Sequence, residues 1–249
     1  MPVAHLHEVY RQAQDSNIVR NAHRVNDGNP PISSEKDPLS SAQKDFFVLY
    51  REEQPLAQDT LLHVVSQKLS KLGFDPLRDI QILTPMHAGI LGTTNLNQSL
   101  QQVLNPHGKA YKTKTKEFRV GDRVLQTRND YENEIYNGDI GSVENIHDDG
   151  ITVRFDEHTV TLSGAQLTDL DLAYAISIHK SQGSEYPAVI VVIHKAHRIM
   201  LRRNLIYTAM TRAKKFCCII GSAWAIAFAA KQEEGGERYT SLGERLQEK

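Results

Sequence analysis

The chain has 249 residues, of which 40% are hydrophobic and 24% charged, and its formal net charge is −1. This length suits one large domain or two small ones with a well-formed core. No apolar run is long enough to span a membrane, and the N-terminus lacks the basic and apolar segments of a secretory signal. The balanced charge excludes a uniformly basic surface, so binding of nucleic acid would need a local groove.

Segments with helical and strand character alternate along most of the chain. Ile18, Ala22 and Val25 fall on one face of a helix that Gly28 would end, and Val189–Ile193 is a continuous β-branched run typical of a buried parallel strand. We expect helices at 15–28, 59–72, 93–104 and 201–213, and strands at 46–50, 80–84, 173–178, 189–193 and 216–220. This order predicts an α/β fold, a parallel sheet covered by helices on both faces.

The texture changes between residues 118 and 167, where glycine-containing turns separate short alternating runs. This pattern predicts a small antiparallel β-barrel inserted into the α/β domain. Just before and within its start, basic residues cluster in a way that fits either a nucleic-acid groove or a solvated linker: Lys109, Lys112, Lys114, Lys116, Arg119 and Arg123.

Three features argue against metal or redox chemistry in this chain. Cys217 and Cys218 are adjacent in an apolar run and are expected to be buried thiols of a cytoplasmic protein. His194 and His197 have no carboxylate or cysteine nearby in the sequence and are expected to be a surface pair. The run from Ile151 to Glu157 ends in two acidic residues, but its alternation predicts an exposed hairpin rather than a magnesium site.

A phosphate-binding loop of the form GxxxxGK[ST] is absent from the sequence. The nearest Gly-Lys pair, Gly108-Lys109, is followed by alanine and lacks the earlier glycine. The chain is therefore not a complete phosphate-loop enzyme.

Two polar segments remain as candidates for chemistry. In Ile176–Tyr186, ISIHKSQGSEY, hydroxyl, imidazole and ammonium groups could donate hydrogen bonds to phosphate, and Gly183 would allow close backbone approach. In Asn204–Lys215, NLIYTAMTRAKK, Arg212 would project from the last turn of a helix, a position where arginine commonly just complements the helix dipole.

Both segments resemble motifs of the RecD-like branch of superfamily 1 DNA helicases, namely motifs V and VI. Further stretches are similar in order and spacing: Glu8–Gln12, Ile82–Gly89, and Gly121–Gln126 followed by Tyr136–Gly141. The resemblance runs from about Pro2 to Ser222 and implies a RecA-like motor lobe with an SH3-like β-barrel insertion. It divides the chain into 1–117 and 168–223 as the lobe, 118–167 as the barrel, and 224–249 as a polar tail.

The resemblance also implies roles for individual residues. Arg212 and Arg11 would contact the γ-phosphate of ATP, with Gly183, Glu185 and Gln12 near the nucleotide. Single-stranded DNA would be contacted by Thr84, Ser177, His179, Lys180, Ser181 and Gln182. ATP and Mg²⁺ would be shared with a missing N-terminal RecA-like lobe, supplied in cis or in trans, and translocation would run 5′ to 3′.

Because the family's chain continues before Met1, we expect a truncated gene, a split gene or an excised fragment, without ATPase activity alone. Two alternatives stay open. One is a non-enzymatic module that binds single-stranded DNA or docks on a helicase. The other is a fragment of a conjugative relaxase–helicase, which would carry the same motifs. No membrane association is expected.

Overall fold

The structure is a computed structural model that describes residues 16–36, 44–156 and 158–233. Its central element is a five-stranded sheet in the order β1-β12-β11-β2-β10, and all neighbouring strands run parallel. The strands are β1 (Phe46–Tyr50), β2 (Ile80–Thr84), β10 (Ala175–Ser177), β11 (Tyr186–Ile193) and β12 (Ala213–Gly221). The predicted parallel α/β sheet is confirmed.

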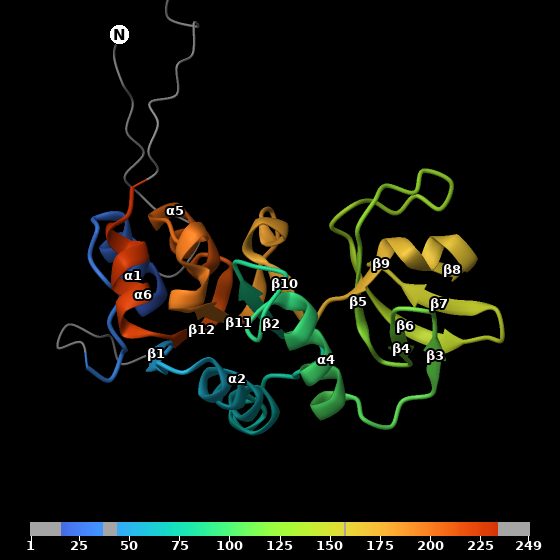
Figure 1. The fold of residues 1–249 in the computed structure, drawn as a ribbon, viewed down its shortest axis with the longest axis horizontal. Coiled ribbons are helices and arrows are strands. Elements are labelled where there is room, and N and C mark those ends of the chain that lie inside the picture. Colours follow the sequence, from blue (N-terminus) through green and yellow to red (C-terminus); the bar gives the residue numbers. More distant parts are fainter. Residues whose placement is uncertain (1–15, 37–43, 157, 234–249) are drawn as a thin grey trace, which may run out of the picture.

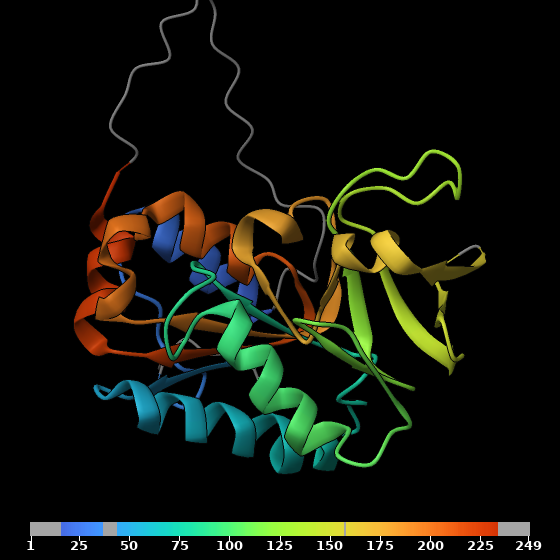
Figure 2. The same cartoon turned by 45° about the vertical axis from the view of Figure 1, so that its right-hand side comes forward.

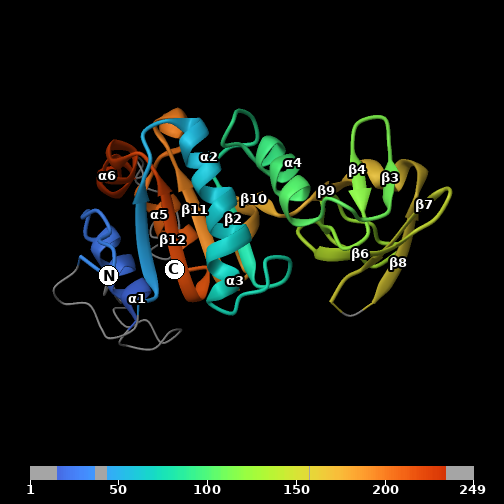
Figure 3. The same ribbon diagram turned by 90° about the horizontal axis from the view of Figure 1, so that it is seen from below.

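Helices cover both faces of this sheet (Figures 2 and 3). On one face pack α1 (Asn17–Asn26), α5 (Arg203–Met210) and α6 (Ala223–Lys231). On the other lie α2 (Gln54–His63), continued by η1 (Val64–Lys68) and α3 (Leu69–Lys71), and α4 (Thr93–Leu104). Among the described ranges, no helix is long and apolar enough to cross a membrane.

The two cysteines show how one strand serves both cores. Side chains alternate along a strand, so Cys217 faces the core beneath α1, α5 and α6, whereas Cys218 faces the core beneath α2 and α4. Both thiols are buried, and loss of solvation raises the pKa of Cys218 to about 12. The prediction of buried cysteines is confirmed.

The inserted domain is a second sheet in the order β8-β7-β6-β5-β9, with antiparallel pairing throughout (Figure 1). Its strands are β5 (Arg123–Gln126), β6 (Ile140–Ile146), β7 (Gly150–Arg154), β8 (Thr159–Ser163) and β9 (Leu170–Leu172), with η2 (Gly164–Asp169) before β9. A hairpin of β3 (Ala110–Lys112) and β4 (Glu117–Arg119) precedes it. The barrel has its own core, and the expected hairpin after Ile151 is confirmed as β7–β8.

Asp122 ties the barrel to the lobe. Its buried carboxylate accepts hydrogen bonds from the side chains of Gln101 and Asn105, from the Tyr174 hydroxyl and from the Arg119 backbone. Loss of solvation raises the pKa of Asp122, against the opposing effect of its donors. One carboxylate therefore links α4, the strand that leads into the barrel and the segment that leaves it.

The basic cluster is largely used within the fold. Arg123 is buried and donates to the Ile80 carbonyl (2.8 Å) and to Gln81 Oε1 (2.9 Å). Lys116 contacts Asp171 at 2.7 Å and also donates to two backbone carbonyls of the barrel. Arg123 therefore joins the barrel to the lobe, whereas Lys116 joins the β3–β4 hairpin to the barrel. Neither the groove nor the linker interpretation anticipated these contacts.

Two predictions are wrong. Residues 224–231 are not a polar tail, because α6 buries Ala225, Ile226, Ala229 and Ala230 on a face of small residues packed in the core. The helix expected at 201–213 ends at Met210, and Arg212 lies in the turn before β12.

The expected surface pair of histidines is also wrong. His194 and His197 are buried at the end of β11, in η4 (Lys195–Met200) and its cap. His197 Nδ1 accepts from the His194 backbone, and His194 Nε2 contacts the Glu52 carbonyl oxygen at 2.9 Å. Burial lowers the pKa of His197 to about 4. The two rings thus terminate a strand, a role that their spacing alone did not indicate.

Candidate functional site

Arg212 is held in the turn between α5 and β12 by contacts within the chain. Its guanidinium donates to the Thr208 carbonyl (3.2 Å), the Ser184 carbonyl (3.1 Å) and the Thr211 hydroxyl (3.4 Å). Its own carbonyl accepts from the backbone of Tyr186, the first residue of β11. The half-buried side chain is therefore fixed at the amino ends of β11 and β12.

Gly183 and Glu185 lie at the same end of the sheet. Gly183 has φ +87°, a conformation that strains other residues, although a Cβ there would meet open space. Glu185 is within 3.4 Å of Lys214 on β12. The structure therefore brings together Arg212, Gly183 and Glu185, three of the residues predicted to lie near ATP.

Thr84 and Ser177 lie at the opposite end, paired in register where β2 and β10 finish. Both are buried; the Thr84 hydroxyl donates to the Leu91 carbonyl, and the Ser177 hydroxyl accepts from the Lys180 backbone. Ser181 is fully buried and donates to the Ile178 carbonyl. The hydroxyls of these three residues are thus engaged within the fold, and their contact with DNA stays a prediction.

One short segment joins the two ends of the sheet. It consists of η3 (Ile178–Ser181) and the four residues up to Glu185, and its exposed side chains include His179 and Gln182. Tyr186 lies two residues before the Ala188–Ile80 pair, whereas Ser177 pairs with Thr84, so the two ends are about 20 Å apart at ~3.3 Å per residue. The predicted motif therefore runs from the carboxyl ends of the strands to their amino ends.

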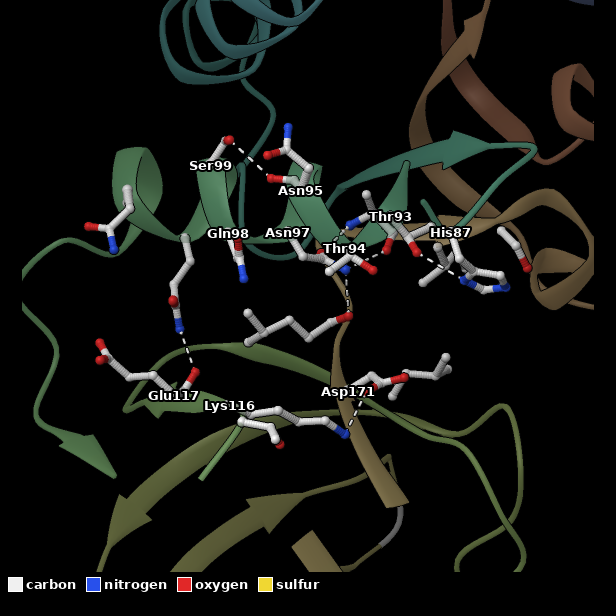
Figure 4. Close-up of a pocket in the computed structure, with 18 of the residues that line it drawn as sticks. His87, Thr93, Thr94, Asn95, Asn97, Gln98, Ser99, Lys116, Glu117 and Asp171 are labelled. Carbon is white, nitrogen blue, oxygen red and sulfur yellow. Dashed lines mark hydrogen bonds and ion pairs between the residues drawn. The ribbon is translucent and has the colours of Figure 1, made fainter. Parts of the chain in front are cut away.

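A pocket of ≈ 790 Å³ lies between α4 and the barrel (Figure 4). Ser177 and Lys180 line it from the η3 side, and Lys116, with its partner Asp171, lines it from the barrel. His87 lies at one side, where its Nδ1 is 3.0 Å from the Thr93 hydroxyl. The pocket joins one part of the predicted DNA-binding segment to the inserted domain.

The wall formed by α4 was not anticipated from the sequence. Thr94, Gln98 and Gln102 fall at i, i+4 and i+8, are exposed and line the pocket. The helix carries no charged residue, so this wall offers uncharged donors and acceptors. The signal in the sequence was a helix rich in uncharged polar residues, with its few leucines on the buried face.

The remaining predictions concern Arg11, Gln12 and metal binding. Arg11 and Gln12 lie outside the described residues. Within 16–36, 44–156 and 158–233, no cluster of three His, Cys, Asp or Glu side chains could hold a metal ion.

The chain is similar in sequence to several known proteins. The family model described as the ATP-dependent RecD-like DNA helicase SH3 domain matches residues 96–155, and the UvrD-like helicase C-terminal domain matches residues 172–220. An ATP-dependent RecD2 DNA helicase from Deinococcus radiodurans is 39% identical over 98% of this chain, which covers 32% of the relative. A RecBCD enzyme subunit RecD from Mycolicibacterium smegmatis is 37% identical over 51% of this chain and 22% of its own length. The chain thus spans a third or less of these relatives.

Solved structures agree on the fold. A structure of two coordinating Pif1 helicases at forked double-stranded DNA has a TM-score of 0.51 at 17% identity, over 96% of this chain and 53% of that one. Bacteroides Pif1 bound to single-stranded DNA also has a TM-score of 0.51, at 16% identity over 89% and 52% of the two chains. In sequence, the chain is similar to the C-terminal part of RecD-like superfamily 1 helicases, and its fold is that of the Pif1 structures.

Proposed function

We propose that the chain is the second motor lobe of an ATP-dependent DNA helicase that moves 5′ to 3′ on single-stranded DNA. In this proposal Arg212 contacts ATP bound by an N-terminal RecA-like lobe, supplied in cis or in trans, and the pocket between α4 and the barrel binds single-stranded DNA. The observation that carries it is the segment from Ile178 to Glu185, which starts beside the pocket and ends beside Arg212.

At the amino ends of β11 and β12, the residue suited to bind a phosphate is Arg212. A guanidinium presents several donors in a fixed plane, which suits phosphate oxygens, and Arg212 lies at a turn where a neighbouring lobe could reach it. ATP with Mg²⁺ supplies the free energy of phosphoryl transfer. Arg212 would neutralise charge that develops on the γ-phosphate, and Glu185 and Gly183 would shape the adjoining backbone. Arg11 and Gln12 are proposed to act at the same nucleotide.

The pocket fits a nucleic-acid strand by its chemistry. Lys180 supplies positive charge, while the amides and hydroxyls of α4 can bond to bases or sugars in any sequence. The carboxylates of Glu117 and Asp171 are paired with Lys112 and Lys116, which reduces their repulsion of phosphate. Exposed His179 and Gln182 extend this surface, and Thr84, Ser177 and Ser181 would support it.

A chimera tests the motor proposal directly. This chain would replace the matching segment of the Deinococcus relative, and DNA-stimulated ATP hydrolysis and unwinding of tailed duplexes would be measured. We expect activity on 5′-tailed substrates and none from the isolated chain. Robust DNA-stimulated ATP turnover by the isolated chain, or a chimera that unwinds 3′-tailed substrates instead, would contradict the proposal.

The alternative of a non-enzymatic DNA-binding module is separated by the same material. If the chimera folds and binds oligo(dT) but is inactive, and the isolated chain binds oligo(dT) equally well, the module is favoured. The relaxase–helicase alternative shares the motor and would give the same result as the main proposal in this assay.

A further inference from the structure

A loop from Arg128 to Asp139 extends away from the barrel, between β5 and β6 (Figure 1, in yellow-green). It carries two exposed aromatic side chains, Tyr131 at 76% and Tyr136 at 47% exposure. Their ring centroids are 6.3 Å apart in an edge-to-face arrangement. The proposed motor site uses neither ring, and neither lines the pocket beside α4.

The loop is held in one shape by its own polar groups. The Asp130 carboxylate accepts from the backbones of Glu132 and Asn133 and from the Asn133 side chain, and these bonds lower its pKa. Ile135 is fully buried in the barrel core, and the Tyr136 backbone donates to Asp139. A surface fixed before binding loses less conformational entropy when a partner arrives.

The charge of the loop is strongly acidic. Residues 128–139 contain the carboxylates of Asp130, Glu132, Glu134 and Asp139 and one cation, Arg128. That cation is itself within 3.5 Å of Asp169 on the barrel. Phosphate would be repelled here, whereas a positively charged group would be attracted both by the carboxylates and by the faces of the tyrosine rings.

We propose that the Tyr131–Tyr136 loop is a docking site for a partner protein, through a cationic segment that presents arginine or lysine side chains. An arginine would lie over a tyrosine ring while its guanidinium pairs with Glu132 or Glu134. This inference goes beyond the motor proposal and does not depend on it.

The probe is a peptide of alternating glycine and arginine, (Gly-Arg)₄, with (Gly-Gln)₄ as the uncharged control. Each peptide would be titrated into the full chain carrying isotope-labelled tyrosine, and the NMR signals of the tyrosines would report which rings are contacted. We expect the Tyr131 and Tyr136 signals to shift with (Gly-Arg)₄ alone, and the shift to weaken as salt is raised. The double substitution Tyr131→Ala, Tyr136→Ala should weaken binding at least about 5-fold, since each ring contributes a cation–π contact.

Matched variants separate the rings from general acidity. Tyr50→Ala removes a tyrosine of 44% exposure from the lobe and should leave peptide binding unchanged. Tyr131→Phe with Tyr136→Phe keeps both rings and should bind like the unmodified chain, whereas Glu132→Gln with Glu134→Gln should bind more weakly. Oligo(dT) that shifts the two tyrosine signals in place of the peptide would make the loop a nucleic-acid platform and overturn the proposal. Full binding by the double alanine variant would also overturn it.

Discussion

The guanidinium of Arg212 donates a hydrogen bond of 3.1 Å to the backbone carbonyl of Ser184. This contact joins the turn after α5 to the last residues of the segment that begins at η3. The position of Arg212 is therefore tied to the backbone whose other end borders the pocket.

Replacing Arg212 should separate hydrolysis from DNA binding. In the chimera with the Deinococcus relative, Arg212→Ala should lower DNA-stimulated ATP turnover by roughly 10³-fold or more, because a charge that stabilises phosphoryl transfer is lost. Binding of oligo(dT), measured by fluorescence anisotropy, should stay within about 2-fold, because Arg212 does not line the pocket and lies at the opposite end of the sheet. Arg78→Ala removes an arginine whose side chain is 81% exposed and serves as the control. Equal turnover by Arg212→Ala and Arg78→Ala would remove Arg212 from the site.

Lys180 should account for part of the salt dependence of DNA binding. Lys180→Ala is expected to reduce the slope of log K against log salt for oligo(dT) by about 0.7, the value for one phosphate contact on a single strand. Lys71→Ala, at an exposed position at the end of α3, should leave the slope unchanged. Identical slopes for both variants would place the DNA elsewhere.

Loss of the Asp122 carboxylate should destabilise the chain. Asp122→Ala leaves the buried Tyr174 hydroxyl without its acceptor and removes one of two acceptors from each of the Gln101 and Asn105 amides, so the free energy of unfolding should fall by about 3 kcal/mol. Urea unfolding followed by circular dichroism measures this change. Asp148→Ala, at an exposed turn, should change it by less than about 0.5 kcal/mol. A small effect at Asp122 would show that the junction repacks without it.

His197 should make stability fall in mild acid. Its pKa is about 4 in the fold against an ordinary value of 6.5, so the unfolded chain binds its proton first as pH falls. The stability contribution is complete above pH 6.5 and is lost between pH 6.5 and about 4, with a total of about 3 kcal/mol. Unfolding curves at several pH values should show a shallower loss for His197→Gln than for the unmodified chain. Parallel curves would assign the acid sensitivity to other groups.

The sequence predicted the strands of the lobe well because these strands are short, mostly apolar segments. Phe46–Tyr50 and Ile80–Thr84 coincide with β1 and β2. Both are covered on two faces, so hydrophobicity alone locates them. The barrel was located by its turns, because each turn needs particular residues. These are local signals, readable without knowledge of the partner strand.

What the sequence did not predict depends on contacts between distant segments. Arg123 and Lys116 appeared in the sequence as members of a basic cluster. In the structure, Arg123 bonds to Ile80 of the lobe, and Lys116 pairs with Asp171 of the barrel. The buried ring of His194 forms a hydrogen bond with the carbonyl of Glu52, which is far away in the sequence. The polar side chains of α4 form a pocket wall only because the barrel lies opposite them. Periodicity does not encode such pairings.

The pairing of β5 with β9 has a consequence for how the chain could vary. Val124 pairs with Leu172, so the barrel leaves the lobe and rejoins it at neighbouring points. Segments whose ends lie close together can be exchanged for longer or shorter ones without moving the rest of a protein. We therefore expect that a short turn in place of the barrel would keep the order of the five parallel strands, while removing one wall of the pocket and the contacts of Arg123 with the lobe.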